Sequence, residues 1–201
     1  MKSLKFVILL FFTSLIVSGC GSSKGVQSRR TKLEENECRK LAMEKPSTRA
    51  WGRAVHPDMS HAISYAEADA RNKFAAAIET AVKLGRTVYD EGYQKATADN
   101  HEGAVVRDDQ GKRELENAQV AGAVVRNTVV IKDELYELRN GQIEAYVTLE
   151  YTGDIGDMTS AIVKNIKQRV SDEERQRIDY DEKKFREYIE EELKKMRAAD
   201  K

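Results

Sequence analysis

The chain has 201 residues, 34 % of them charged, and its 34 Lys and Arg equal its 34 Asp and Glu in number. Binding to nucleic acid requires a basic surface that displaces counterions from the phosphates, so this balance argues against a nucleic-acid partner. It also argues against adhesion to anionic lipid by charge alone. The length suits one domain with a tether or an extension.

The first 19 residues have the pattern of an export signal. Lys2 and Lys5 precede an almost unbroken apolar run over 6–17, and the small residues Ser18 and Gly19 stand directly before Cys20. A bilayer-spanning helix takes about 20 apolar residues, so this shorter run predicts a removable signal peptide. The pattern resembles the bacterial lipobox, in which cleavage before the Cys is coupled to acylation of its thiol.

We therefore predict a signal peptide over 1–19, then lipidated Cys20 and a flexible tether over 20–32. The mature chain has 182 residues, with 32 basic and 34 acidic side chains. Acyl chains contribute about 0.8 kcal/mol of membrane-binding free energy per buried CH₂, so several chains on Cys20 would hold the protein on the membrane almost permanently. We expect a membrane-anchored protein of the bacterial cell envelope, at the outer membrane, with either face possible.

Cys38 is the only other cysteine, so no internal disulfide forms. We interpret it as an ordinary residue on a short polar helix, with intermolecular oxidation as the alternative. That helix begins a predicted domain over 33–157. A strand over 47–55 follows, in which Trp51 is interpreted as a core or rim anchor and Gly52 marks close packing or a bulge.

The strongest helix of the chain begins near Met59. Its apolar positions are separated by steps of three and four residues, which predicts one buried stripe. The stripe consists of Met59, Ala62, Ile63, Ala66, Ala70, Phe74, Ala77, Ile78, Ala81 and Val82. The alanines allow this helix to lie close against a sheet, and we expect Phe74 and Ile78 to be buried there.

A two-stranded segment is predicted after a long excursion over 99–119. Residues 120–138 are β-rich, and Asn140-Gly141 favours a two-residue hairpin turn that sets Leu138 opposite Ile143. Residues 143–151 alternate between apolar and polar, which predicts one buried face and one wet face. A bulge over 132–134 would keep the charged side chains there out of the core.

The C-terminal part, 158–201, is predicted to be a helical extension. Ser171-x-x-Glu174 is a capping box that indicates a break or a fresh start. The charged helix beyond it has a narrow apolar stripe, which we expect to pack either on its own domain or on another chain; in the second case the stripe is a partner surface. That surface consists of Ile178, Phe185, Ile189 and Leu193.

The predicted fold class is α+β: a small antiparallel sheet of about three strands packed against a long Ala-rich helix, plus a C-terminal charged helix. Ala66-Glu67-Ala68-Asp69-Ala70-Arg71, followed by Phe74-Ala75 and Ile78, comes after the Trp/Gly strand and before Ile143–Leu149. This order resembles the bacterial twenty-kilodalton (LPP) lipoprotein family, whose domain also recurs in flagellar-assembly proteins. The resemblance covers about 47–152. It implies a small envelope domain and no catalytic residues.

We assign no catalytic residue, metal ligand or cofactor. His56, Asp58 and His61 lie within six residues, but their spacing across Pro57 is not that of a helical ligand pair, so metal binding is the weaker interpretation. The sequence has no nucleophile elbow, phosphate loop or paired Cys motif. Three functions stay open: a lipid-anchored binding or scaffolding module, an oligomer-forming lipoprotein, and an envelope hydrolase.

Overall fold

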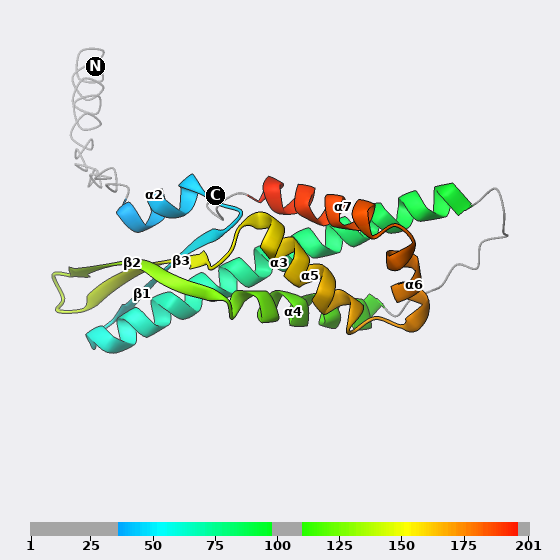
Figure 1. Cartoon of the computed structure of the whole chain (residues 1–201). Coiled ribbons are helices and arrows are strands. Elements are labelled where there is room, and N and C mark those ends of the chain that lie inside the picture. The colour runs from blue at the N-terminus through cyan, green and yellow to red at the C-terminus, as the bar shows by residue number, and fades with distance from the viewer. Residues whose placement is uncertain (1–35, 98–109, 197–201) are drawn as a thin grey trace, which may run out of the picture. The chain divides into compact units, whose positions relative to one another are not determined.

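A three-stranded antiparallel sheet and six helices make up the described residues, 36–97 and 110–196, of the computed structural model (Figure 1). The elements are α2 (Glu37–Glu44), β1 (Arg49–His56), α3 (Met59–Thr97), α4 (Gln110–Val125), β2 (Thr128–Glu137), β3 (Ile143–Tyr151), α5 (Ile155–Lys167), α6 (Asp172–Tyr180) and α7 (Glu182–Lys195). The predicted α+β class is therefore confirmed. The predicted signal peptide, Cys20 and the tether lie outside the described residues.

Helix α3 contacts both the sheet and the other long helices. Asp58 caps its start, because the Asp58 carboxylate accepts a 2.9 Å hydrogen bond from the backbone N–H of His61. Along its buried stripe, small residues in the first half pack on the sheet and larger ones in the second half pack on α4 and α7 (Figure 1). Phe74 and Ile78 are fully buried, as predicted, but among the helices rather than on the sheet.

The sheet has the strand order β1-β3-β2, with β3 in the centre. One face of β3 packs its Ala145, Val147 and Leu149 against the alanines of α3. Helix α2 covers the other face, where the Thr148 hydroxyl donates a 2.8 Å hydrogen bond to the carbonyl oxygen of Cys38. The prediction of a wet face on β3 is thus wrong at Tyr146 and Thr148, both of which are buried.

The hairpin between β2 and β3 has a three-residue loop, not the predicted two-residue turn. The Gly141 N–H donates to the carbonyl oxygen of Leu138, and Leu138 N–H donates to Gln142. Of the described residues only Gly141 has a positive φ, whereas a two-residue I′ turn needs two such residues. The register therefore places Glu137, and not Leu138, opposite Ile143. The register shift between Val130 and Lys132 lies next to the predicted bulge.

Two predictions are wrong over the residues of helix α4: the irregular excursion up to residue 119 and the β-rich segment from residue 120. Its buried residues recur with the period of a helix and face α3 and α5. They are Glu116, Asn117, Val120, Ala121, Val124 and Val125. Valines have only a slightly lower helix propensity than unbranched residues, so burial of this stripe outweighs their β preference.

The C-terminal helices belong to the core of the same compact unit, which spans Glu35–Lys201. Ser171 caps α6, as its capping pattern predicted, and separates it from α5. Helix α7 lies along α3, with Ile189 against Gly85. The proposed partner residues are 0–2 % exposed, so they are a core and not a free surface; they are Ile178, Phe185, Ile189 and Leu193. The predicted boundary between the domain and the helical extension, at 157/158, also does not separate two cores, because residues on both sides belong to one cluster.

Candidate functional site

Strand β2 presents the most apolar exposed edge of the sheet. Val129, Val130, Leu135 and Tyr136 are each 38–49 % exposed. In the described residues β2 pairs only with β3, so its other row of backbone N–H and C=O groups faces away from the sheet. Such an edge is a template on which another chain can add a strand.

An aromatic row crosses all three strands on the face that α2 also covers. Trp51 on β1 stacks on Tyr146 of β3 at 6.2 Å, and Tyr136 of β2 meets Tyr146 edge-on at 5.9 Å. The Lys73 ammonium lies 4.5 Å from the centre of the Trp51 ring. Trp51 is half-buried in this row, which fits its interpretation as a rim anchor.

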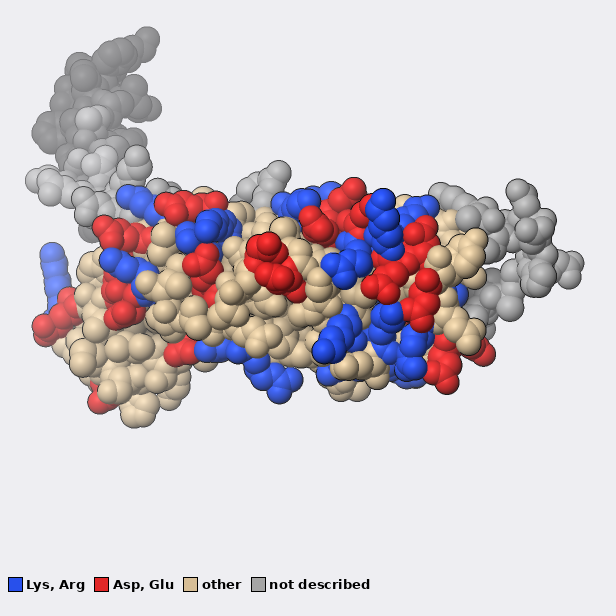
Figure 2. Space-filling view, in the orientation of Figure 1, with Lys and Arg blue, Asp and Glu red and all other residues tan. Residues whose placement is uncertain are grey.

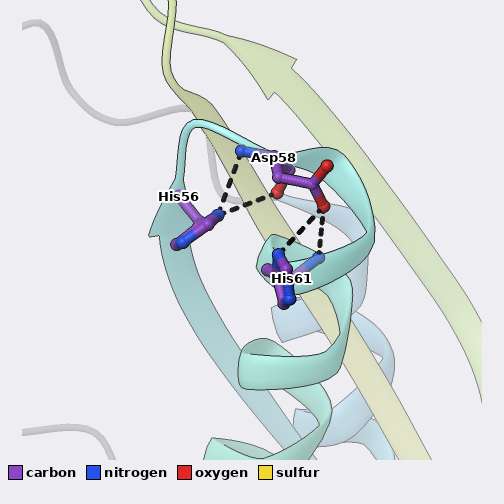
Figure 3. Close-up of side chains that lie close together, drawn as sticks. All are labelled: His56, Asp58 and His61. Carbon is purple, nitrogen blue, oxygen red and sulfur yellow. Dashed lines mark hydrogen bonds and ion pairs between the residues drawn. The ribbon is translucent and has the colours of Figure 1, made fainter.

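A second candidate site brings His56, Asp58 and His61 together where β1 ends and α3 begins (Figure 3). One donor atom from each of the three residues lies within 4.8 Å of the others. His56 is the last residue of β1. The chain then reverses direction at Pro57-Asp58, so the first turn of α3 lies next to His56. Sequence reasoning missed this proximity, because it tested only the spacing of ligands on one helix.

Hydrogen bonds position all three side chains (Figure 3). The backbone N–H of Asp58 donates to Nδ1 of His56 at 3.0 Å, and the same nitrogen lies 3.3 Å from the Asp58 carbonyl oxygen. Nδ1 of His61 lies 3.2 Å from Oδ1 of Asp58. The hydrogen bond from the His61 backbone holds the pKa of the Asp58 carboxyl below its usual value, so this group is ionised at neutral pH.

This cluster is open to solvent. The side chains of His61 and Asp58 are 62 % and 56 % exposed. The two imidazole rings meet edge-on at 4.9 Å, and the exposed Tyr65 stacks on His61 at 6.0 Å. Two imidazoles and a carboxylate are ligands suited to zinc and related divalent transition metals.

A buried ionic cluster joins α3, α4 and α6. The Arg86 guanidinium, 3 % exposed, donates to Asn117 at 2.6 Å, to Glu116 at 3.2 Å and to Glu174 at 2.7 Å. Arg113 also pairs with Asp90 at 2.7 Å beside this cluster. Each carboxylate of this cluster is thus paired with a guanidinium group. We interpret the cluster as a structural clamp, that is, a set of ion pairs that holds α3, α4 and α6 together.

A cleft of about 600 Å³ lies between α5, α6 and α7. Lys164, Lys167, Arg175 and Arg186 contribute to its lining. Acidic partners compensate two of these cations: Lys167 contacts Asp179 and Glu182, and Arg175 contacts Asp172. Acidic and basic side chains are mixed over this helical side of the molecule (Figure 2).

No family model, curated protein or solved structure matches this chain. The resemblance to the LPP lipoprotein family therefore rests on the residues of the sequence pattern alone. Within the described residues, no helix combines the length and apolar character needed to cross a membrane.

Proposed function

We propose that the protein is a lipid-anchored component of the bacterial cell envelope whose folded domain is a binding or scaffolding module without catalytic activity. The export signal ending in Ser18-Gly19-Cys20 supports the anchor, and the resemblance to LPP lipoproteins supports the envelope. The outer membrane is the membrane proposed. The partner is a protein that docks at this domain.

The exposed edge of β2 is the observation on which the binding role depends. Its four exposed apolar side chains lie beside backbone groups that no described strand pairs. Isolated apolar side chains are common on protein surfaces, whereas several on one edge strand favour association. This edge replaces α7 as the proposed partner surface, because the apolar stripe of α7 is buried in the domain itself.

The anchor is tested by mass spectrometry of the protein extracted from cell membranes. We expect the wild-type N-terminus to be an acylated Cys20, and we expect Cys20→Ser to remain uncleaved and unacylated. An unacylated wild-type chain that retains residues 1–19 would contradict the proposed anchor. That result would not bear on the proposed binding surface at the edge of β2, which the next experiment tests.

The binding surface is tested by photo-crosslinking in intact cells. A photoreactive residue at Val129 or Leu135 should give crosslinked products, whereas the same residue at Tyr180 should give fewer. Tyr180 is a control, because it is also exposed but lies on α6. Equal yields at all three positions would argue against a specific surface on β2.

Self-association is the second candidate, favoured by the order of residues along β2. Val129 and Val130 lie near one end of the strand and Leu135 and Tyr136 near the other. When two copies pair antiparallel, these two apolar ends meet, while the centre brings Lys132 close to the partner's acidic residues. Crosslinked products at twice the mass of the chain would indicate this dimer, and products of other masses would indicate a different partner.

A further inference from the structure

We propose that His56, Asp58 and His61 bind one divalent transition-metal ion, with Zn²⁺ as the ion that suits these donors. The proposal is independent of the lipid anchor and of the β2 edge. It follows from three observations: the mixed nitrogen and oxygen donors, their separations, and the hydrogen bonds that orient them.

The separations are close to those of a tetrahedral site. Zinc binds nitrogen and oxygen at about 2.0–2.2 Å, which places neighbouring ligand atoms roughly 3.3 Å apart in a tetrahedron. Nδ1 of His61 and Oδ1 of Asp58 already lie 3.2 Å apart. The whole set spans at most 4.8 Å, so a small rotation of side chains brings the third donor into range. Exposure of His61 and Asp58 makes such a rotation sterically easy.

The backbone of Asp58 orients His56 for binding. Metal binding at Nε2 of His56 requires the tautomer with the proton on Nδ1. In that tautomer Nδ1 donates to the Asp58 carbonyl oxygen at 3.3 Å, and this contact replaces the 3.0 Å hydrogen bond that Nδ1 accepts from the Asp58 N–H in the other tautomer. A hydrogen bond from the second ring nitrogen to a backbone carbonyl is a common support for metal-bound histidine. The Asp58 carboxylate completes the set with an oxygen donor beside the two imidazoles.

The site is placed on two packed elements. His56 ends β1, and Asp58 and His61 lie at the start of α3, which packs against β1. A bound ion would therefore connect the end of the strand to the first turn of the helix. Three protein ligands leave a fourth position open to solvent, where water or a donor from another molecule can bind.

Isothermal titration with Zn²⁺ tests the site on the full-length, untagged chain in detergent. We expect one ion per wild-type chain and no comparable binding of Ca²⁺, a hard cation that prefers oxygen ligands. His56→Gln and His61→Gln should each weaken Zn²⁺ binding by roughly tenfold or more. His101→Gln is the control, because it removes the remaining histidine, which lies outside the described residues, and should leave binding unchanged.

Asp58→Asn separates the metal site from the helix cap, since Asn caps a helix about as well as Asp. We expect this variant to keep the melting temperature of the metal-free protein while its Zn²⁺ affinity falls. X-ray absorption of the wild-type zinc complex requires no variant and should show imidazole and oxygen ligands without sulfur. Sulfur ligands, or Zn²⁺ affinity that survives both histidine substitutions, would overturn the proposal. Absence of one-to-one binding by the wild-type chain would overturn it as well.

Discussion

Gly52 on β1 lies directly against the backbone of Ala66 on α3. A Cβ atom added at Gly52 would be 2.1 Å from the carbonyl oxygen of Ala66 and 2.3 Å from the backbone nitrogen of Ala70. No side chain can rotate away to relieve this contact, because the obstructing atoms belong to the helix backbone. The distance between the sheet and α3 therefore depends on a glycine at this position.

Gly52→Ala is expected to destabilise the domain by about 1–3 kcal/mol or more, because the strand and the helix must separate to admit a methyl group. Urea denaturation of the two proteins measures the difference. Gly122→Ala is the matched control: nothing lies within 4 Å of a Cβ at this exposed position in α4. That variant should gain up to about 1 kcal/mol from helix propensity. Equal stabilities for both variants would refute the close packing at Gly52.

Arg86→Met is expected to cost about 3–5 kcal/mol, because it leaves the buried carboxylates of Glu116 and Glu174 without their main partner. Lys83→Met removes a cation from the same helix but from an exposed pair with Glu114, at 3.5 Å. Its effect should stay within about 1 kcal/mol. Chemical denaturation at neutral pH measures both, and a loss at Arg86 no larger than that at Lys83 would contradict the clamp.

Phe185→Ala is expected to cost about 3–5 kcal/mol, because Phe185 is buried against Tyr89 and fills the space between α7 and α3. The loss should be the same at every protein concentration, since the contact lies within one chain. Tyr180→Ala, at an 80 % exposed position, is the control and should change stability by about 0.5 kcal/mol or less. A melting temperature that rises with protein concentration only in the wild type would point to an intermolecular role for α7.

Burial raises the pKa of the Cys38 thiol from 9.0 to about 11. The unfolded chain therefore loses this proton at lower pH than the folded one, and ionisation favours unfolding. The stability that this group contributes is present below pH 9 and is lost as the pH rises towards 11, by about 1.4 kcal/mol per unit.

Denaturation of the wild type and of Cys38→Ser at several pH values isolates this contribution, because the serine hydroxyl does not titrate there. We expect the wild type to lose stability more steeply between pH 9 and 11. In a Cys20→Ser background, where Cys38 is the only thiol, iodoacetamide should react only after urea is added. Rapid alkylation of the folded protein would show that Cys38 is accessible.

The long helix and the central strand could be predicted from sequence because each has its own periodicity. The alanine and phenylalanine stripe of α3 and the apolar face of β3 are local patterns; the stripe is confirmed from Ala62 onwards, and Ala145, Val147 and Leu149 are buried as predicted. Helix α4 was missed because its valines favour strands locally, while the burial that stabilises it comes from α3 and α5. The covered face of β3 was missed for a related reason, since α2 reaches Thr148 across 110 residues.

The candidate sites depended even more on contacts between distant or reversing segments. Nothing in the local sequence pairs Arg86 with Glu174, 88 residues away. The approach of His56 to His61 depends on a chain reversal at Pro57, which a spacing rule for one helix does not represent. The apolar residues of the C-terminal part were predicted on one helix, but Ile178 lies on α6 and the other three on α7, and only the fold shows that their own domain covers them.

The strand order has a consequence for synthesis. His56 pairs with Ile143, so β1 is complete 87 residues before the first residue of its partner strand is made. At about 5–20 residues per second this delay lasts on the order of 10 s. During that time the edge of β1 that will face β3 has no partner, whereas β2 and β3 can pair as a local hairpin as soon as both exist. We expect β1 to join last, and the nascent chain to be most prone to aggregation before β3 has been made.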